Sequence, residues 1–100
     1  MNTPGFRIKE NSSLARLASK KLGVDNVAIV FGNTIHLYGR SKAAFLADSR
    51  WVKHELCHVK QFKEHGFFPF IAKYLWESIR KGYYNNKYEA EARAAEEEHP

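Results

Sequence analysis

Two short runs of β-forming residues, joined by a Gly-Asn turn, limit the folds open to this sequence. Val27 to Phe31 and Thr34 to Tyr38 are rich in β-branched and aromatic side chains, and only Gly32 and Asn33 separate them. This arrangement is typical of a tight antiparallel hairpin, because glycine and asparagine accept the backbone conformation that such a turn requires.

A helical pattern precedes the hairpin. Leu14, Leu17 and Ala18 fall on one face at the spacing of an α-helix, and Gly23 is placed to end that helix. We therefore expect a helix over residues 13–22, with a polar residue just before it accepting from its first amides.

Three more helical patterns follow the hairpin, after a segment that fits several structures. That segment, residues 39–48, could be a loop, a third short strand or the lead into a helix. The helices are expected over about residues 49–64, 68–81 and 87–97. The whole pattern predicts an α+β fold, with one N-terminal helix, a small antiparallel sheet and then three helices.

Length and composition indicate one folded unit. The chain has 100 residues, 44% of them apolar, which excludes a disordered chain. Its single cysteine excludes an internal disulfide and a zinc site made only of cysteines. No apolar run reaches the ~18 residues of a transmembrane helix, and the start lacks the apolar stretch of a signal peptide, so we expect a cytoplasmic location.

The net charge of +5 is unevenly placed along the chain. Residues 1–50 hold eight Lys and Arg against three acidic residues, whereas residues 51–100 hold eight of each. A basic front half could attract nucleic acid, an anionic membrane surface or an acidic partner. The basic residues are scattered and no nucleic-acid motif is present, so no nucleic-acid partner is expected.

Residues 54–58 read His-Glu-Leu-Cys-His, which is the HExxH pattern. Positions i and i+4 of a helix lie one turn apart on the same side, so His54 and His58 can hold one zinc ion. Glu55 then lies beside the metal, where its carboxylate can take a proton from a zinc-bound water. Apolar residues recur at helical spacing around the motif, which places it on the helix expected over residues 49–64.

A catalytic zinc usually takes three protein ligands and leaves a fourth position for water. The longer metzincin motif is absent, because Gln61 and Glu64 stand where its glycine and its third histidine would be. The helix over residues 87–97 offers Glu89 and Glu91. These two side chains are about 200° apart on a helix, so only one of them can face the metal.

The HELCH motif, followed by a helical Tyr-Glu-Ala-Glu-Ala, resembles the gluzincin group of zinc metallopeptidases, in which a glutamate on a later helix is the third ligand. The resemblance spans Arg50 to Ala95, and it extends to the membrane prenyl proteases and to small bacterial HExxH domains, some of them attached to contractile injection systems. It implies that Glu89 binds zinc and that Ala92 packs beneath it. Related sequences often have an aspartate four residues after the ligand, where this chain has Arg93.

An aspartate at that position would orient a ligand histidine by accepting its second N–H. In this chain, other acceptors are needed for that role. The candidates are a backbone carbonyl, Asp48, Asn85 and Glu91.

Several further side chains allow more than one interpretation. His36 could lie on an edge strand that pairs with an extended substrate, or it could simply be exposed. Cys57 is expected to pack as a small apolar residue, the alternative being a redox-sensitive or switch cysteine at the metal. The candidates for stabilising an oxyanion are Tyr83, Tyr84, Tyr88, His36 and Arg50.

The aromatic run at the start of the helix expected over residues 68–81 is predicted to be part of the core. Its members are Phe67, Phe68, Phe70, Tyr74 and Trp76. One face carries Ile71, Tyr74, Leu75 and Ile79 at helical spacing. The alternative is an interfacial membrane helix, since basic residues flank the apolar ones. Those basic residues are Lys73, Arg80 and Lys81.

Residues 1–100 are therefore predicted to form a single, minimal zincin-like metallopeptidase domain with one Zn²⁺ per chain. The predicted ligands are His54, His58 and Glu89, and Glu55 is the predicted general base for hydrolysis of a peptide or protein substrate. One alternative is a catalytically silent zinc-binding module that docks another protein. Another is a basic adaptor for nucleic acid or membrane in which HExxH is accidental.

Overall fold

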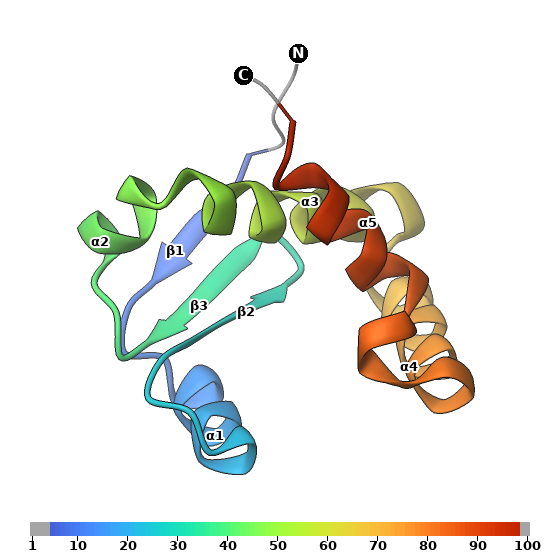
Figure 1. Ribbon diagram of the computed structural model, residues 1–100, viewed down its shortest axis with the longest axis horizontal. Coiled ribbons are helices and arrows are strands. Elements are labelled where there is room, and N and C mark those ends of the chain that lie inside the picture. Colours follow the sequence, from blue (N-terminus) through green and yellow to red (C-terminus); the bar gives the residue numbers. More distant parts are fainter. Residues whose placement is uncertain (1–4, 99–100) are drawn as a thin grey trace.

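The helices and strands follow the predicted α+β order (Figure 1). This computed structural model describes residues 5–98, and in that range the chain forms a three-stranded sheet and five helices. The strands are β1 (Arg7–Lys9), β2 (Val27–Phe31) and β3 (Thr34–Tyr38). The helices are α1 (Ser13–Leu22), α2 (Lys42–Ala47), α3 (Ser49–His65), α4 (Phe67–Asn85) and α5 (Lys87–Ala95).

The sheet contains one strand more than the predicted hairpin. Strands β2 and β3 pair antiparallel around Gly32, as predicted, with Ile29 opposite His36. Strand β1 lies parallel to β3 on its other side, which gives the order β1-β3-β2. The expectation that His36 lies on an edge strand is therefore wrong, because β3 is the central strand and β2 forms the edge.

Alternation along β3 sets the two faces of the sheet. Ile35 and Leu37 are fully buried and pack with Val59 of α3. His36 points to the opposite face, where its Nδ1 lies 2.7 Å from the hydroxyl of Ser12, the residue that caps α1. Helix α3 therefore covers one face of the sheet and α1 covers the other (Figure 1).

Side-chain caps lie at the start of four of the helices. The Ser12 hydroxyl accepts from the third residue of α1, and the Ser41 hydroxyl accepts from the third residue of α2. The Asp48 carboxylate accepts from Trp51 of α3, and the Asn86 amide oxygen accepts from Tyr88 of α5. The segment over residues 39–48, which the sequence left open, is neither a loop nor a strand. It contains a short helix of its own, α2, which ends at Ala47 directly before the cap of α3.

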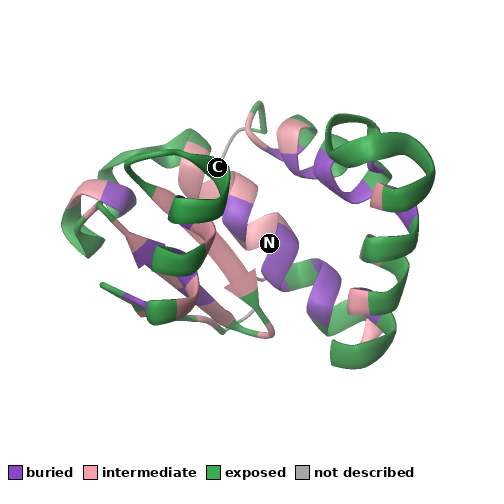
Figure 2. Ribbon diagram, turned by 90° about the horizontal axis from the view of Figure 1, so that it is seen from below, coloured by how far each residue is buried: buried purple, intermediate pink, exposed green. Residues whose placement is uncertain are grey.

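Helix α4 differs from its prediction. Its regular part ends at Gly82, as expected, where the backbone leaves the helical conformation with φ 80°. Phe70 is buried, but Phe67, Phe68 and Trp76 are exposed, so the expectation that the aromatic run is core is wrong for these three. Leu75 and Ile79 are exposed as well. The reason is that α4 packs on α3 and α5 and extends beyond the sheet, which leaves its outer side largely uncovered (Figure 2).

None of the helices between residues 5 and 98 has the length and apolar character needed to cross a membrane.

Gly39 is the glycine whose replacement should cost the most stability. It has φ +78°, and a Cβ added there would lie 2.1 Å from the Asp25 carbonyl oxygen. Gly23 also has a positive φ, +68°, but a Cβ there meets open space. We expect Gly39→Ala to lower the free energy of unfolding by ~3 kcal/mol or more and Gly23→Ala by ~1 kcal/mol, measured by urea denaturation. Equal losses would contradict the close backbone approach at Gly39.

Candidate metal centre

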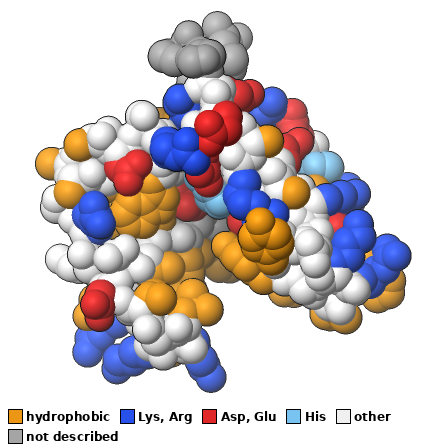
Figure 3. Space-filling view, in the orientation of Figure 1, with side chains coloured by type: hydrophobic (Ala, Val, Ile, Leu, Met, Phe, Trp, Pro, Cys, Tyr) orange, Lys and Arg blue, Asp and Glu red, His pale blue; other side chains and the backbone are white. Residues whose placement is uncertain are grey.

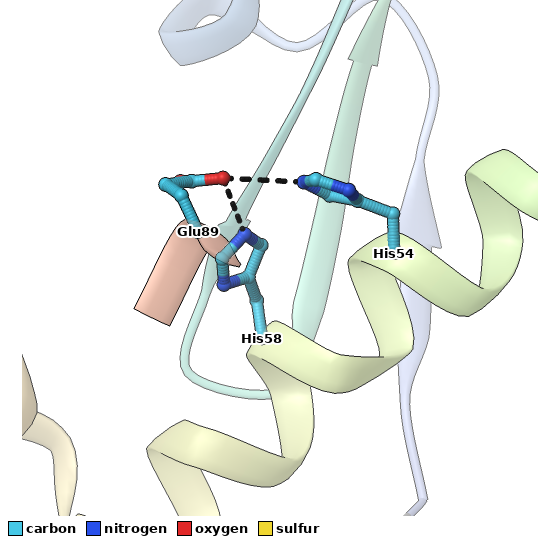
Figure 4. A group of neighbouring side chains, drawn as sticks. All are labelled: His54, His58 and Glu89. Atoms are coloured by element: carbon cyan, nitrogen blue, oxygen red, sulfur yellow. Dashed lines mark hydrogen bonds and ion pairs between the residues drawn. The ribbon is translucent and has the colours of Figure 1, made fainter. Parts of the chain in front are cut away.

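The two histidines of HExxH and one glutamate of α5 meet in the interior between helices (Figure 4). His54 and His58 project from successive turns of α3, and Glu89 reaches them from the first turn of α5. The Glu89 Oε1 atom lies 3.2 Å from His54 Nε2 and 3.3 Å from His58 Nε2. Potential ligand atoms of the three residues all lie within 4.8 Å of one another, so the group could hold a metal ion.

The donor set and its spacing fit a zinc ion. Two imidazoles and one carboxylate form a known ligand set of catalytic zinc sites. A tetrahedron with zinc–ligand bonds of about 2.0–2.1 Å has edges of about 3.3 Å, which matches both separations between a histidine and Glu89. The same distances are also those of hydrogen bonds between Glu89 and the two imidazoles.

A second set of contacts orients the two imidazole rings. His54 Nδ1 lies 2.7 Å from Glu96 Oε2, and His58 Nδ1 lies 2.8 Å from Gln61 Oε1. Each Nδ1–H can be donated to its acceptor, which directs both Nε2 atoms towards Glu89. These acceptors are not the candidates that the sequence suggested, although Glu96 lies two helical turns after Glu89 and Gln61 lies one turn after His58.

Glu91 does not join the metal-binding group. It is exposed, and its carboxylate accepts from the Gln61 side chain at 2.6 Å. It therefore supports His58 indirectly, through Gln61. Ala92, the small residue that the family resemblance places beneath the ligand glutamate, is fully buried.

Cys57 lies outside the group as well. Its sulfur is near the Gln61 amide, on the side of α3 that also meets Glu91. Burial and the Glu91 carboxylate raise the pKa of the Cys57 thiol to about 12, so the neutral thiol predominates near neutral pH.

Tyr74 is a further site residue that the sequence did not reveal. Its hydroxyl donates to Glu89 Oε2 at 2.5 Å, so both carboxylate oxygens of Glu89 are occupied. Helical spacing groups Tyr74 with apolar neighbours of α4 and does not indicate a polar partner 15 residues further along the chain.

The predicted oxyanion candidates lie in different places. Only Tyr83, among those five residues, lines the cavity beside the histidines. Arg50 is held by ion pairs with Glu96 and Glu97, at 3.1 and 2.5 Å. The remaining candidates are occupied elsewhere: Tyr84 lies under the Arg93 guanidinium, Tyr88 is buried in the core, and His36 contacts Ser12.

Burial and charge pairing shift the acidities of the site residues in the metal-free protein. Burial raises the pKa of Glu55 to about 7, although His54 and His58 beside it act in the opposite direction. Burial lowers the pKa of His54, but hydrogen bonds to Glu89 and Glu96 outweigh this and raise it to about 9. Burial also opposes ionisation of Glu89, yet hydrogen bonds from both histidines hold its pKa well below the usual range. The group therefore carries a proton that a metal ion would have to displace.

A cavity of about 490 Å³ lies against the site. Its lining includes Glu55 and the three potential ligands on one side, and apolar side chains of β2 and α4 on the others. In the space-filling view the molecule is hollowed between α1 and α4, with hydrophobic side chains in the hollow (Figure 3). A cavity of this volume with a mainly apolar lining is in the size range of sites that bind small organic molecules.

Comparison of this chain with protein-family models, with curated proteins and with solved structures finds no match. The interpretation of the site therefore stands on its geometry and chemistry.

Glu96 provides a test of how the histidines are oriented. We expect Glu96→Gln to weaken zinc binding by about 10- to 100-fold, because the amide accepts the His54 Nδ1–H more weakly than the carboxylate does. Zinc affinity can be measured by competition with a chromogenic chelator. Glu97→Gln is the matched control, since Glu97 pairs with Arg50 but does not contact His54. Equal affinities for the two variants would contradict the assigned role of Glu96.

Proposed function

We propose that this protein is a zinc-dependent hydrolase of peptide or amide bonds, with a gluzincin-type site. The observation that carries the proposal is the position of Glu55, whose buried carboxyl lines the same cavity as His54, His58 and Glu89. A metal site with a basic carboxylate and a substrate-sized cavity combines the parts that hydrolysis needs.

Each group has a distinct task in the proposed reaction. Zinc held by the three ligands would lower the pKa of a bound water and polarise the scissile carbonyl. Glu55 accepts the proton of the attacking water as the new C–O bond forms, and passes it to the leaving amine as the C–N bond breaks. Burial supports this role, because it keeps the carboxyl more basic than an exposed glutamate.

The phenol of Tyr83 is placed to assist. It lines the cavity, and a phenolic O–H can donate to the carbonyl oxygen as negative charge develops there. The Tyr74 hydroxyl already donates to Glu89, and this hydrogen bond orients the Glu89 carboxylate from α4.

The free edge of the sheet suggests an extended peptide as substrate. All five residues of β2 line the cavity, and within residues 5–98 no strand pairs with its outer edge. A peptide in extended conformation could add to that edge through backbone hydrogen bonds. The sequence had suggested this substrate-pairing role for the strand that contains His36, which is β3.

Metal content tests the ligand set. Protein purified without added metal or chelator should contain about one zinc per chain, measured by elemental mass spectrometry. We expect His54→Ala and Glu89→Ala to lose it, because each removes one of three ligands. Glu91→Ala should keep it, because Glu91 contacts Gln61 and not the metal-binding group. Metal-free wild-type protein that takes up no added zinc would overturn the proposal.

Turnover tests the role of Glu55. We expect Glu55→Gln to reduce hydrolysis of a peptide library by at least about 100-fold while zinc content is unchanged, since only the proton acceptor is removed. Cleavage can be followed by mass spectrometry. Unimpaired hydrolysis by Glu55→Gln would refute the mechanism. Zinc binding by the wild type without any cleavage would contradict the hydrolase and favour a silent binding module.

A further inference from the structure

Exposed apolar side chains are concentrated on two helices that border the cavity. Within residues 5–98, nine of the twelve exposed large hydrophobic side chains lie on α1 and α4. Four of these side chains have exposed fractions of 66% for Leu22, 54% for Leu75, 59% for Trp76 and 78% for Ile79. We call these four residues and their basic neighbours the α1–α4 face. The basic neighbours are Lys20, Lys21, Arg80 and Lys81.

The α1–α4 face reaches the cavity from both helices. Leu22 of α1 and Leu75 of α4 both line the cavity while remaining exposed. Ile79 follows Leu75 by one helical turn, and Trp76 precedes Ile79 by three residues, so the three share one side of α4.

The same two helices carry an excess of positive charge. They contain six basic residues and a single acidic one, Glu77. Glu77 is buried, where it accepts from the Lys87 backbone N–H and pairs with Lys81, so it adds little negative charge to the surface. The Arg80 guanidinium lies over the Trp76 ring, 5.9 Å from the ring centroid.

Acidic residues follow the end of α5, which lies away from α1 (Figure 1). Glu96, Glu97 and Glu98 are consecutive, and Arg50 forms ion pairs with the first two. The excess of positive charge therefore lies on α1 and α4 and not at this end of the molecule.

The combination of exposed apolar and basic side chains favours a lipid surface over a protein partner or a second copy of this chain. Lysine is depleted in protein–protein interfaces, whereas Lys20, Lys21 and Lys81 belong to this face. A second copy of the chain would bring like charges together. Anionic lipid attracts lysine and arginine, and apolar and aromatic side chains at the same depth enter the head-group region.

We propose that the α1–α4 face docks on an anionic phospholipid surface. Leu75, Trp76 and Ile79 enter the head-group region, and the neighbouring lysines and arginines contact lipid phosphates. The cavity then opens towards the lipid. This inference does not depend on the proposed hydrolase, because it rests on residues outside the metal-binding group.

Vesicle co-sedimentation tests the proposal with the intact protein. We expect binding to phosphatidylcholine vesicles that contain phosphatidylglycerol, weaker binding to phosphatidylcholine alone, and loss of binding at high salt. The double variant Trp76→Ser/Ile79→Ser should bind at least about tenfold more weakly, because two large apolar side chains are removed. Leu46→Ser on α2 is the control, since Leu46 is exposed but lies off the face.

A second pair of variants tests the charges. Lys21→Glu/Arg80→Glu should weaken binding by about tenfold or more. Lys60→Glu/Lys63→Glu on α3 changes the net charge equally but leaves the face intact, so it should bind more tightly than the first pair. Absence of vesicle binding by the wild type, equal losses within either comparison, or a dimer that buries the face without any vesicle binding would overturn the proposal.

Discussion

A carboxylate removed from water is stable only when its oxygens accept hydrogen bonds or meet opposite charge. Glu89 is buried, and it satisfies this requirement with side chains from two other helices. Its Oε1 faces both histidines of α3, and its Oε2 accepts from Tyr74 of α4. Glu89 therefore links α3, α4 and α5, beside the buried aromatic cluster of Phe62, Phe70 and Tyr88 that packs the same three helices together. The same contacts place three potential metal ligands around a common point, so the requirements of folding and of metal binding coincide.

Further hydrogen bonds hold the two histidines at their Nδ1 atoms, on the side away from Glu89. On one side Glu96 holds His54 and is itself paired with Arg50. On the other side Gln61 holds His58 and donates to Glu91. The hydrogen bond at Nδ1 fixes the orientation of each imidazole ring. A ring that is already oriented loses little conformational entropy when its Nε2 atom binds a ligand. Burial also raises the pKa of the Glu55 carboxyl to about 7, against the opposing effect of the two histidines.

The position of α4 links the site to the surface of the molecule. Because α4 leaves the sheet and packs on α3 and α5, a cavity remains between it and β2, and the outer side of the helix stays uncovered. Exposed Trp76 and Ile79 cost the isolated protein favourable burial, and neighbouring basic side chains offset the loss of solubility. A helix that was fully packed would close the cavity. An open cavity and an exposed apolar face are consequences of the same geometry.

Local sequence patterns were sufficient for the hairpin, the helix over residues 13–22 and the one-turn spacing of His54 and His58, because each depends on residues a few positions apart. The α+β order was predictable for the same reason. Local periodicity could not choose between Glu89 and Glu91 from the residues alone, identify Tyr74, or show that β3 is central. Those outcomes depend on how elements far apart in the chain pack together: Glu89 is 31 residues from His58. Only the tertiary structure decides which side of each helix meets another, because a helical repeat defines a face without specifying its neighbour.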